Sequence, residues 1–408
     1  MSAEANQPFR ELESTGGKYF SLSDEPPVFA GGKGAELIAV DGRRYIDFAC
    51  GSGTNALGHN HPAIAEALAG QLRTGITHIG PHFHTEVQGR FYRQLTEVLP
   101  QHLHCFHPAT NGTEATEVAL KAAMHATGRR QFLALEGGYH GRTFGALSVS
   151  EAKGKNKELE PFAPGAAFLP FAEHDDQVKA ALGKAEALMK GGNVAALIVE
   201  PVQATAGMRL PAKGYLEALA ELARKNGCLV IVDEVFCSFG RSGCGFGFQH
   251  FDIEPDLVIL AKSLGGSLPA GLVAGRKGIL RGWKAGTQSS TFQLHPLSAA
   301  AGSAFIEVLI RDGLVKHAGE IGGWFEGARG RIEALPNVRS YRGLGAMWGV
   351  VMENESICHG VRRRALDLGL ITWECGVDGE VIGLVPPLTI EREFFDLALD
   401  RFCQALKG

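Results

Sequence analysis

Two short apolar runs in this sequence end in residues that could do chemistry together. Residues 228–235 read Cys-Leu-Val-Ile-Val-Asp-Glu-Val, and residues 257–262 read Leu-Val-Ile-Leu-Ala-Lys. Both have the composition of buried strands, which puts Asp233 and Lys262 at strand ends. A buried ammonium is unfavourable unless it is paired, depressed in pKa or used covalently, as in a Schiff-base lysine. The alternatives are an acid that only caps a strand and a lysine whose amine extends to solvent.

Pyridoxal phosphate (PLP) is the cofactor that requires both groups. A lysine holds its aldehyde as a Schiff base, and a carboxylate keeps its pyridine nitrogen protonated so that the ring accepts electrons. We therefore interpret Lys262 and Asp233 as catalytic residues that also bind PLP.

A helix start and a glycine-rich loop could complete such a site. The segment 111–117 opens a helix, so the free N–H groups at Gly112 and Thr113 could bind a phosphate; a plain cap formed by Thr113 and Glu117 is the alternative. In the loop 136–143, Tyr139 and His140 follow a predicted strand, and Tyr139 could stack on a planar ring. The glycine-rich run 240–247 is not placed between a strand and a helix, so a dinucleotide loop is disfavoured there.

The composition and net charge limit the kinds of protein that this chain could be. The chain has 408 residues, 45% hydrophobic and 21% charged, with a net charge of −4. These values are ordinary for a globular protein and favour neither nucleic acid nor an anionic membrane as partner. The N-terminus lacks an apolar stretch of signal-peptide length, and no run reaches the roughly 20 apolar residues of a membrane span. We therefore expect a cytoplasmic protein.

Cysteine and histidine usage does not favour a metal site. The eight cysteines are scattered without CxxC pairs, as expected for reduced, mostly buried thiols. Eight of the fifteen histidines lie between His59 and His107. The HxH pairs among them would point to opposite faces of a strand, and no acid or cysteine recurs beside them at ligand spacing. We predict no metal.

The order of predicted elements indicates an α/β fold. Strands are predicted at 131–136, 195–200, 228–235, 257–262 and 271–275, and helices at 62–73, 85–99, 113–126 and 214–226. This alternation implies a mostly parallel sheet that binds ligands at the carboxyl ends of its strands. We expect residues 1–50 to contribute to a small domain, 51–299 to form a large PLP-binding domain with this central sheet, and 300–408 to form a smaller α+β domain.

Taken together, these segments resemble the class III, omega-type PLP-dependent aminotransferases of fold type I. The resemblance extends from the hairpin at Asp41-Gly42 and the segment 57–62 to the Val-Pro-Pro-Leu-Thr segment at 385–389. It implies a Schiff base at Lys262 and a contact between Asp233 and the pyridinium nitrogen. It implies further cofactor contacts from residues already named and from others: Gly112, Thr113, Tyr139, His140, Glu200, Gln203 (to the phenolic oxygen), Val235 (opposite Tyr139) and Thr291. Because Thr291 would come from a partner subunit, the resemblance also implies a homodimer.

Three positions depart from the family pattern. Many members have an arginine three residues before Pro-Pro-Leu that binds a substrate carboxylate, whereas this chain has Gly383. The glutamate that usually masks this arginine is replaced by Thr205. Arg142 is then the best remaining carboxylate ligand, with a structural ion pair as the alternative. A further departure is His295, where the family usually has asparagine.

Two more residues are candidates for substrate contact. Glu374 lies near the place where some relatives have a mobile arginine, and it could favour a polyamine or an amino sugar. The alternative is a solvated acid. Phe83 is the other candidate.

We therefore predict transamination between a primary amine or ω-amino group and a keto acid such as pyruvate. Racemases or epimerases, decarboxylases and aminomutases share the fold and motifs, and they are the first alternative. A non-catalytic PLP-binding protein is the second, and retention of both Lys262 and Asp233 argues against it.

Overall fold

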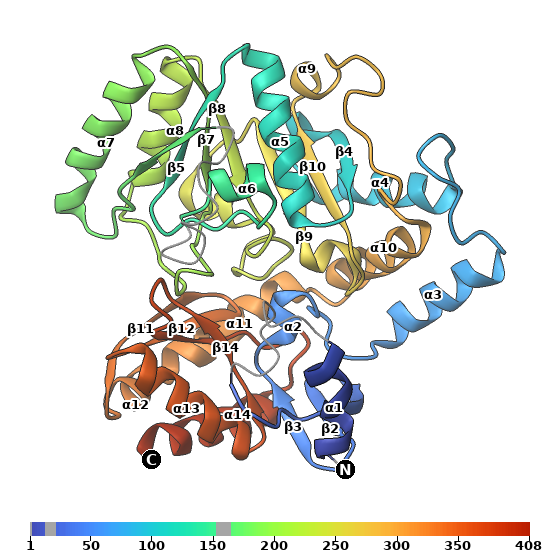
Figure 1. The fold of residues 1–408 in the computed structure, drawn as a ribbon, viewed down its shortest axis with the longest axis vertical. Helices are drawn as coiled ribbons and strands as arrows, with labels where there is room; N and C mark the ends of the chain where they lie inside the picture. Colours follow the sequence, from blue (N-terminus) through green and yellow to red (C-terminus); the bar gives the residue numbers. More distant parts are fainter. Residues whose placement is uncertain (1, 13–21, 152–164) are drawn as a thin grey trace.

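The computed structural model describes residues 2–12, 22–151 and 165–408. Its largest sheet has six strands in the order β10-β9-β8-β7-β5-β6, all parallel except β10 (Figure 1). The bounds are Gln131–Leu135 (β5), Ala166–Leu169 (β6), Val194–Val199 (β7), Leu229–Asp233 (β8), Leu257–Ala261 (β9) and Gly271–Gly275 (β10). The α/β fold with a mostly parallel sheet is confirmed; β6 is a strand that the sequence analysis missed.

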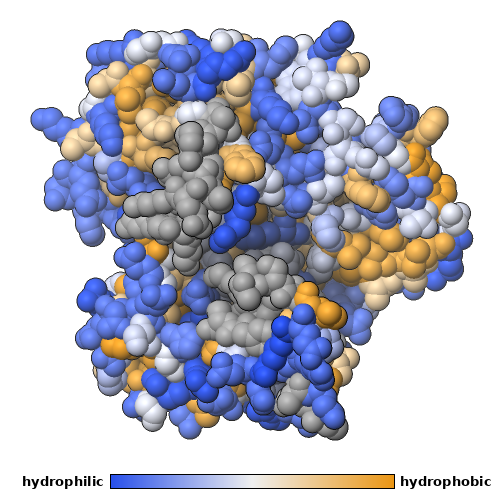
Figure 2. Space-filling view, viewed as in Figure 1, coloured by the Kyte–Doolittle hydropathy of each residue, from blue (hydrophilic) through white to orange (hydrophobic). Residues whose placement is uncertain are grey.

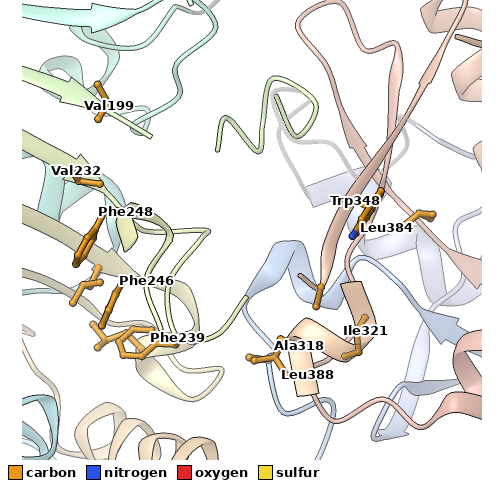
Figure 3. Packing of buried hydrophobic residues seen from close by; sticks show 14 of the residues in the cluster. Val199, Val232, Phe239, Phe246, Phe248, Ala318, Ile321, Trp348, Leu384 and Leu388 are labelled. Atoms are coloured by element: carbon orange, nitrogen blue, oxygen red, sulfur yellow. The ribbon is translucent and has the colours of Figure 1, made fainter. Parts of the chain in front are cut away.

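This sheet is buried on both faces, which explains its continuous apolar runs. Along β8, Val230 and Val232 join one hydrophobic core, while Ile231 between them joins another on the opposite face. Helix α5 (Gly112–Thr127) covers the second core, and helices α7 (Asp175–Met189) and α8 (Tyr215–Lys225) cover the first (Figure 1). Figure 3 shows Val232 near Phe248 in the first core. Such two-sided burial is typical of strands in a parallel sheet.

The carboxyl ends of β8 and β9 place the two predicted chemical groups on adjacent strands. Strand β8 ends at Asp233, and β9 ends at Ala261, directly before Lys262. Lys262 begins the short 3-10 helix η4 (Lys262–Gly265) with a φ of +50°, an uncommon left-handed conformation for a residue other than glycine. Strain of this kind is concentrated at functional sites.

A second sheet lies below the large one in Figure 1. Its four antiparallel strands are ordered β11-β12-β15-β14, with bounds Val338–Leu344 (β11), Met347–Met352 (β12), Trp373–Cys375 (β14) and Val381–Leu384 (β15). Phe325 of helix α11 (Leu314–Gly327) stacks on Trp348 at 5.7 Å and meets Phe395 of helix α14 (Arg392–Lys407) edge to face at 4.7 Å. These rings fix the helices on the sheet.

A third sheet joins the two ends of the chain. The strands β1 (Phe29–Lys33), β2 (Glu36–Ala39) and β3 (Arg44–Asp47) form antiparallel pairs, and the β2–β3 turn is the hairpin predicted at Asp41-Gly42. Strand β3 then pairs in parallel with β13 (Leu370–Ile371). Strand β3 thus joins the N-terminal hairpin to the C-terminal part of the chain, while the domain boundaries stay a prediction.

The remaining helices pack around these sheets. They include α3 (Pro62–Arg73), α4 (Glu86–Val98), α10 (Pro296–Arg311) and α13 (Glu355–Asp367), and α10 contacts both α3 and α4. In the part of the chain that the structure describes, none of the helices combines the length and the apolar character needed to cross a bilayer.

Candidate active site

A cavity of about 460 Å³ opens at the carboxyl edge of the large sheet. The start of α5, the loop after β5 and the ends of β7, β8 and β9 all contribute to its lining. The cavity gathers most of the residues predicted from the sequence: Lys262, Asp233, Gly112, Thr113, Tyr139, His140, Glu200, Val235 and Arg142. Segments far apart in sequence therefore meet where an α/β sheet is expected to bind its ligand.

Asp233 is held in place by two hydrogen bonds. Its Oδ2 lies 2.7 Å from Nδ1 of His140, and its Oδ1 accepts the N–H of Val235 at 2.9 Å. Burial opposes protonation of His140, but the hydrogen bond and the charge of Asp233 outweigh it and raise the pKa of the imidazole. A buried carboxylate fixed in this way can accept a hydrogen bond from a protonated ring nitrogen in the cavity and favour its protonated form.

Lys262 is a partly buried residue whose amine has a strongly perturbed pKa. Burial lowers the pKa of its ammonium to about 8, although the charges of Asp233 and Glu200 oppose the shift. Its Nζ lies 3.8 Å from the ring centroid of Phe236. A substantial fraction of the amine is therefore neutral near pH 8, which is the form that attacks an aldehyde carbon.

The start of α5 has the properties of a phosphate site. The side chain of Asn111 caps the helix by accepting the N–H of Glu114 at 3.0 Å, so Thr113 and Glu117 do not form the cap considered from the sequence. The hydroxyl of Thr113 instead accepts the N–H of Arg142 at 3.1 Å. The first turn of the 16-residue helix faces the cavity at Gly112 and Thr113. Its N–H groups and positive dipole end favour an anion there.

Tyr139, Glu200 and Arg142 line another part of the cavity. The backbone N–H of Tyr139 donates to the Glu200 carboxylate at 2.9 Å, and burial raises the pKa of that acid. The Arg142 guanidinium lies 6.0 Å from the Tyr139 ring centroid and is exposed. Among the residues that the structure describes, no acidic side chain forms an ion pair with Arg142, so the structural ion pair considered from the sequence is not seen there.

These residues fit PLP. A helix start that favours an anion, a buried carboxylate held by a histidine and a buried amine of lowered pKa line one cavity. Each matches one functional group of the cofactor: the phosphate, the pyridine nitrogen and the aldehyde. Among the described residues there is no group of three or more His, Cys, Asp or Glu side chains that could hold a metal ion.

Gln203 and Glu374 do not reach this cavity, because each has a partner elsewhere. The fully buried Gln203 amide donates to the carbonyl of Glu136 at 3.0 Å and accepts from Arg209 at 3.1 Å. The Glu374 carboxylate pairs with Arg362 at 2.7 Å. Neither side chain therefore lines the cavity, and the contacts of Gln203 with the phenolic oxygen and of Glu374 with the substrate stay predictions.

Phe83 and Thr291 lie outside the cavity of their own chain. Phe83 is 67% exposed and lies beside Tyr92 in a separate small surface pocket. Thr291 is exposed and precedes Phe292, which is 58% exposed. A role for either residue in a PLP site would require a second copy of the chain.

Phe236 is a cavity residue that was not predicted from the sequence. It directly follows Val235, so its position after β8 is the available signal. The rest of the lining consists of Thr54, Asn111, Gly141, Thr205, Ala261 and the segment 267–270.

Known proteins resemble the whole chain. The aminotransferase class-III family matches residues 23–406. The acetylornithine aminotransferase from Methanothermobacter thermautotrophicus is 36% identical to this chain, and the match covers 92% of this chain and 93% of that protein. The acetylornithine aminotransferase from Methanopyrus kandleri is also 36% identical, and the match covers 94% of this chain and 95% of that protein. The ornithine aminotransferase from Toxoplasma gondii has a TM-score of 0.90 at 28% identity, covering 100% of this chain and 95% of its own. An (S)-enantioselective omega-transaminase from Thermomicrobium roseum has a TM-score of 0.91 at 26% identity, covering 99% and 98%.

Replacing Lys262 with methionine is expected to stabilise the cofactor-free protein at neutral pH. Burial lowers the pKa of Lys262 from 10.5 to about 8 in the folded state, so between these values the unfolded state binds more protons. The wild type therefore loses stability as the pH falls through this window, on the order of 3 kcal/mol in total. Urea denaturation should show Lys262→Met more stable by about that amount at pH 7 and equal to the wild type near pH 10.5.

The matched control is Lys179→Met, at an exposed position on α7. Its free energy of unfolding should follow that of the wild type at both pH values. A gain at Lys262→Met that did not change with pH would contradict a lowered pKa.

Proposed function

The chain belongs to the class III aminotransferase family, whose members depend on PLP, and from that premise we propose that it transfers an amino group from a primary amine or an ω-amino compound to a keto acid such as pyruvate. The observation that carries this proposal is the placement of Lys262, Asp233 and the start of α5 around one cavity. Arg142 lines the cavity, and its guanidinium can pair with the carboxylate of a small keto acid.

The chain's own residues divide the work of this reaction. PLP, when bound, supplies an aldehyde for the amine and a ring that accepts electrons. Lys262 would hold the aldehyde of PLP through Nζ, and its amine would move the proton at the substrate carbon. Asp233, oriented by His140, would accept a hydrogen bond from the protonated pyridine nitrogen. Gly112 and Thr113 would bind the phosphate through the start of α5.

A half-reaction tests the proposed function. We expect that mixing the PLP-loaded protein with an amine donor bleaches its visible absorption band and leaves pyridoxamine phosphate, and that pyruvate then restores the band and yields alanine. Lys262→Ala should abolish both steps, and borohydride should no longer fix PLP to the protein. Absorption and mass spectrometry report these outcomes.

The same experiment separates the alternatives. Racemisation or decarboxylation of the donor without a keto product would show that the protein catalyses another PLP reaction instead of transamination. Fixation of PLP at a different lysine would refute the role of Lys262. A loaded protein that converts none of the donors would support a non-catalytic PLP-binding role.

Arg142 is proposed to bind the carboxylate of the keto acid. Arg142→Ala is expected to raise the KM for pyruvate about 10- to 100-fold, because a charge-assisted contact is lost. The KM for an amine without a carboxylate should change little. Arg281→Ala, an exposed arginine outside the cavity, is the control and should alter neither value in steady-state assays. Equal increases for both substrates at Arg142→Ala would indicate a structural role.

We further propose a homodimer in which Thr291 reaches the partner's phosphate site. Four exposed apolar side chains lie in or near α3 and the Thr291 segment: Leu72, Ile76, Phe83 and Phe292. Figure 2 shows a hydrophobic area over this side of the molecule. The ring of His295 caps α10 by accepting the N–H of Leu297, and it stacks on the His78 ring with centroids 5.1 Å apart. These contacts help to fix the segment that contains Thr291. A polar rim with apolar anchors is typical of an interface between subunits.

Light scattering should therefore give twice the chain mass, and Thr291→Ala should weaken PLP binding without changing that mass. A monomer that binds PLP as tightly as the dimer would contradict the proposal. Thr287→Ala, at another hydroxyl on the same loop, serves as the control, because its hydroxyl bonds the Lys284 carbonyl within its own turn.

A further inference from the structure

The amine of Lys262 lies over the face of one aromatic ring. Its Nζ is 3.8 Å from the ring centroid of Phe236, well inside the distance of about 6 Å at which a ring face attracts a cation. Within the described part of the chain, this Nζ forms no hydrogen bond and no ion pair. The ring face is therefore the contact that holds the amine.

The charged and titratable groups that act on this amine do so without contacting it, as far as the described residues show. Burial is the largest effect and lowers the pKa of the amine. Asp233 and Glu200 oppose the shift, but their carboxylates are hydrogen-bonded to His140 and to two backbone N–H groups. Two further groups act on it: Cys237 raises the pKa and Arg241 lowers it.

The Phe236 ring is itself held by two neighbours. The indole of Trp373, on β14, stacks on it with ring centroids 4.9 Å apart and planes 18° apart. A Cβ atom at Gly53 would lie 3.0 Å from Cε2 and Cζ of the ring, and the φ of +81° at Gly53 also disfavours a side chain there. The ring is 7% exposed. Turning it away from the amine would require one of these neighbours to move.

The ring face and the burial act on the amine in opposite directions. The π electrons of the ring attract an ammonium, so the contact favours the protonated form, whereas burial favours the neutral form. The contact also restricts the position of the amine. A lysine side chain is a flexible four-carbon chain, and the cavity of about 460 Å³ would otherwise allow Nζ many positions.

We propose that Phe236 is a positioning residue for Lys262, and that its ring face holds the protonated amine at one place in the cavity while Nζ is not bonded to the cofactor. Trp373 and Gly53 contribute by fixing the ring. This inference rests on the proposed function, because the amine that is held is the one proposed to move the proton at the substrate carbon.

Replacing Phe236 with pentafluorophenylalanine tests the contact, because fluorine withdraws electrons from the ring face and changes the shape of the ring little. In the cofactor-free, full-length chain, trace acetic anhydride acetylates only neutral amines, and peptide mass spectrometry follows Lys262 as the pH varies. Fluorination should lower the pKa of Lys262 by about one pKa unit, a tenfold change in its protonation equilibrium. Phe236→Leu, which is apolar but has no ring, should shift the pKa in the same direction.

A double-mutant cycle tests the part played by Trp373. Trp373→Leu should lower the pKa of Lys262 by a smaller amount, because the ring remains but is held less firmly. In the Phe236→Leu background the same substitution should have no further effect, since no ring is left to hold. Additive shifts in the double variant would contradict the role of Trp373.

Pentafluorophenylalanine at Phe402 is the matched control. Phe402 is a buried ring on α14, and among the described residues no cation lies over it. This variant should keep the wild-type pKa of Lys262, and the exposed Lys179 serves as an internal reference. Misfolding is recognised by its sign, because an exposed amine would titrate closer to 10.5. A pKa of Lys262 that is unchanged or raised in both Phe236 variants would overturn the proposal.

The rate of PLP loading gives a second readout. Because the neutral amine attacks the aldehyde, the pH of half-maximal loading should fall together with the pKa in both Phe236 variants. If the wild type loads no PLP while fluorination still lowers the pKa of Lys262, the proposed function fails and the contact stands. If the wild type transaminates while all variants share one pKa, the contact is refuted and the proposed function stands.

Discussion

The cavity depends on keeping an ammonium and a carboxylate buried at the ends of adjacent strands. Neither Lys262 nor Asp233 could remain charged alone in that position, because transfer of an isolated ion from water is too unfavourable. The structure resolves this in two ways. His140 hydrogen-bonds Asp233, and Lys262 gives up part of its charge as burial lowers its pKa to about 8. The burial that lowers the pKa of Lys262 destabilises the cofactor-free protein, and it also increases the fraction of the amine that is neutral and nucleophilic. At this residue, stability is therefore lost where reactivity is gained.

The large sheet could be predicted from the sequence because its signals are local. Apolar β-branched runs that end in a charge identify β8 and β9, and a helix that opens with Asn-Gly-Thr identifies the start of α5. The sequence does not indicate side-chain partners that are remote along the chain. Nothing near Gln203 indicates that Arg209 and the Glu136 carbonyl will occupy its amide, and nothing near Glu374 indicates Arg362. Short polar side chains on loops have several available partners, and tertiary packing decides among them.

The surroundings of Gly383 illustrate the same limit. The sequence shows Gly383 and Thr205 as departures from the family pattern but does not indicate which side chain packs at position 383. Trp373 of the neighbouring strand packs there and stacks on Phe236. A missing side chain is visible in one sequence, whereas the group that fills its space is visible only once the strands are paired.

Phe236 connects the cavity to the second sheet. The residues that fit PLP come from the large sheet and its loops, whereas Trp373 lies on the antiparallel hairpin of the second sheet. The Phe236 ring contacts both Lys262 and Trp373. A change on the hairpin can therefore act on the environment of the amine through Phe236, while His140 and the N–H of Val235 still hold Asp233 in place.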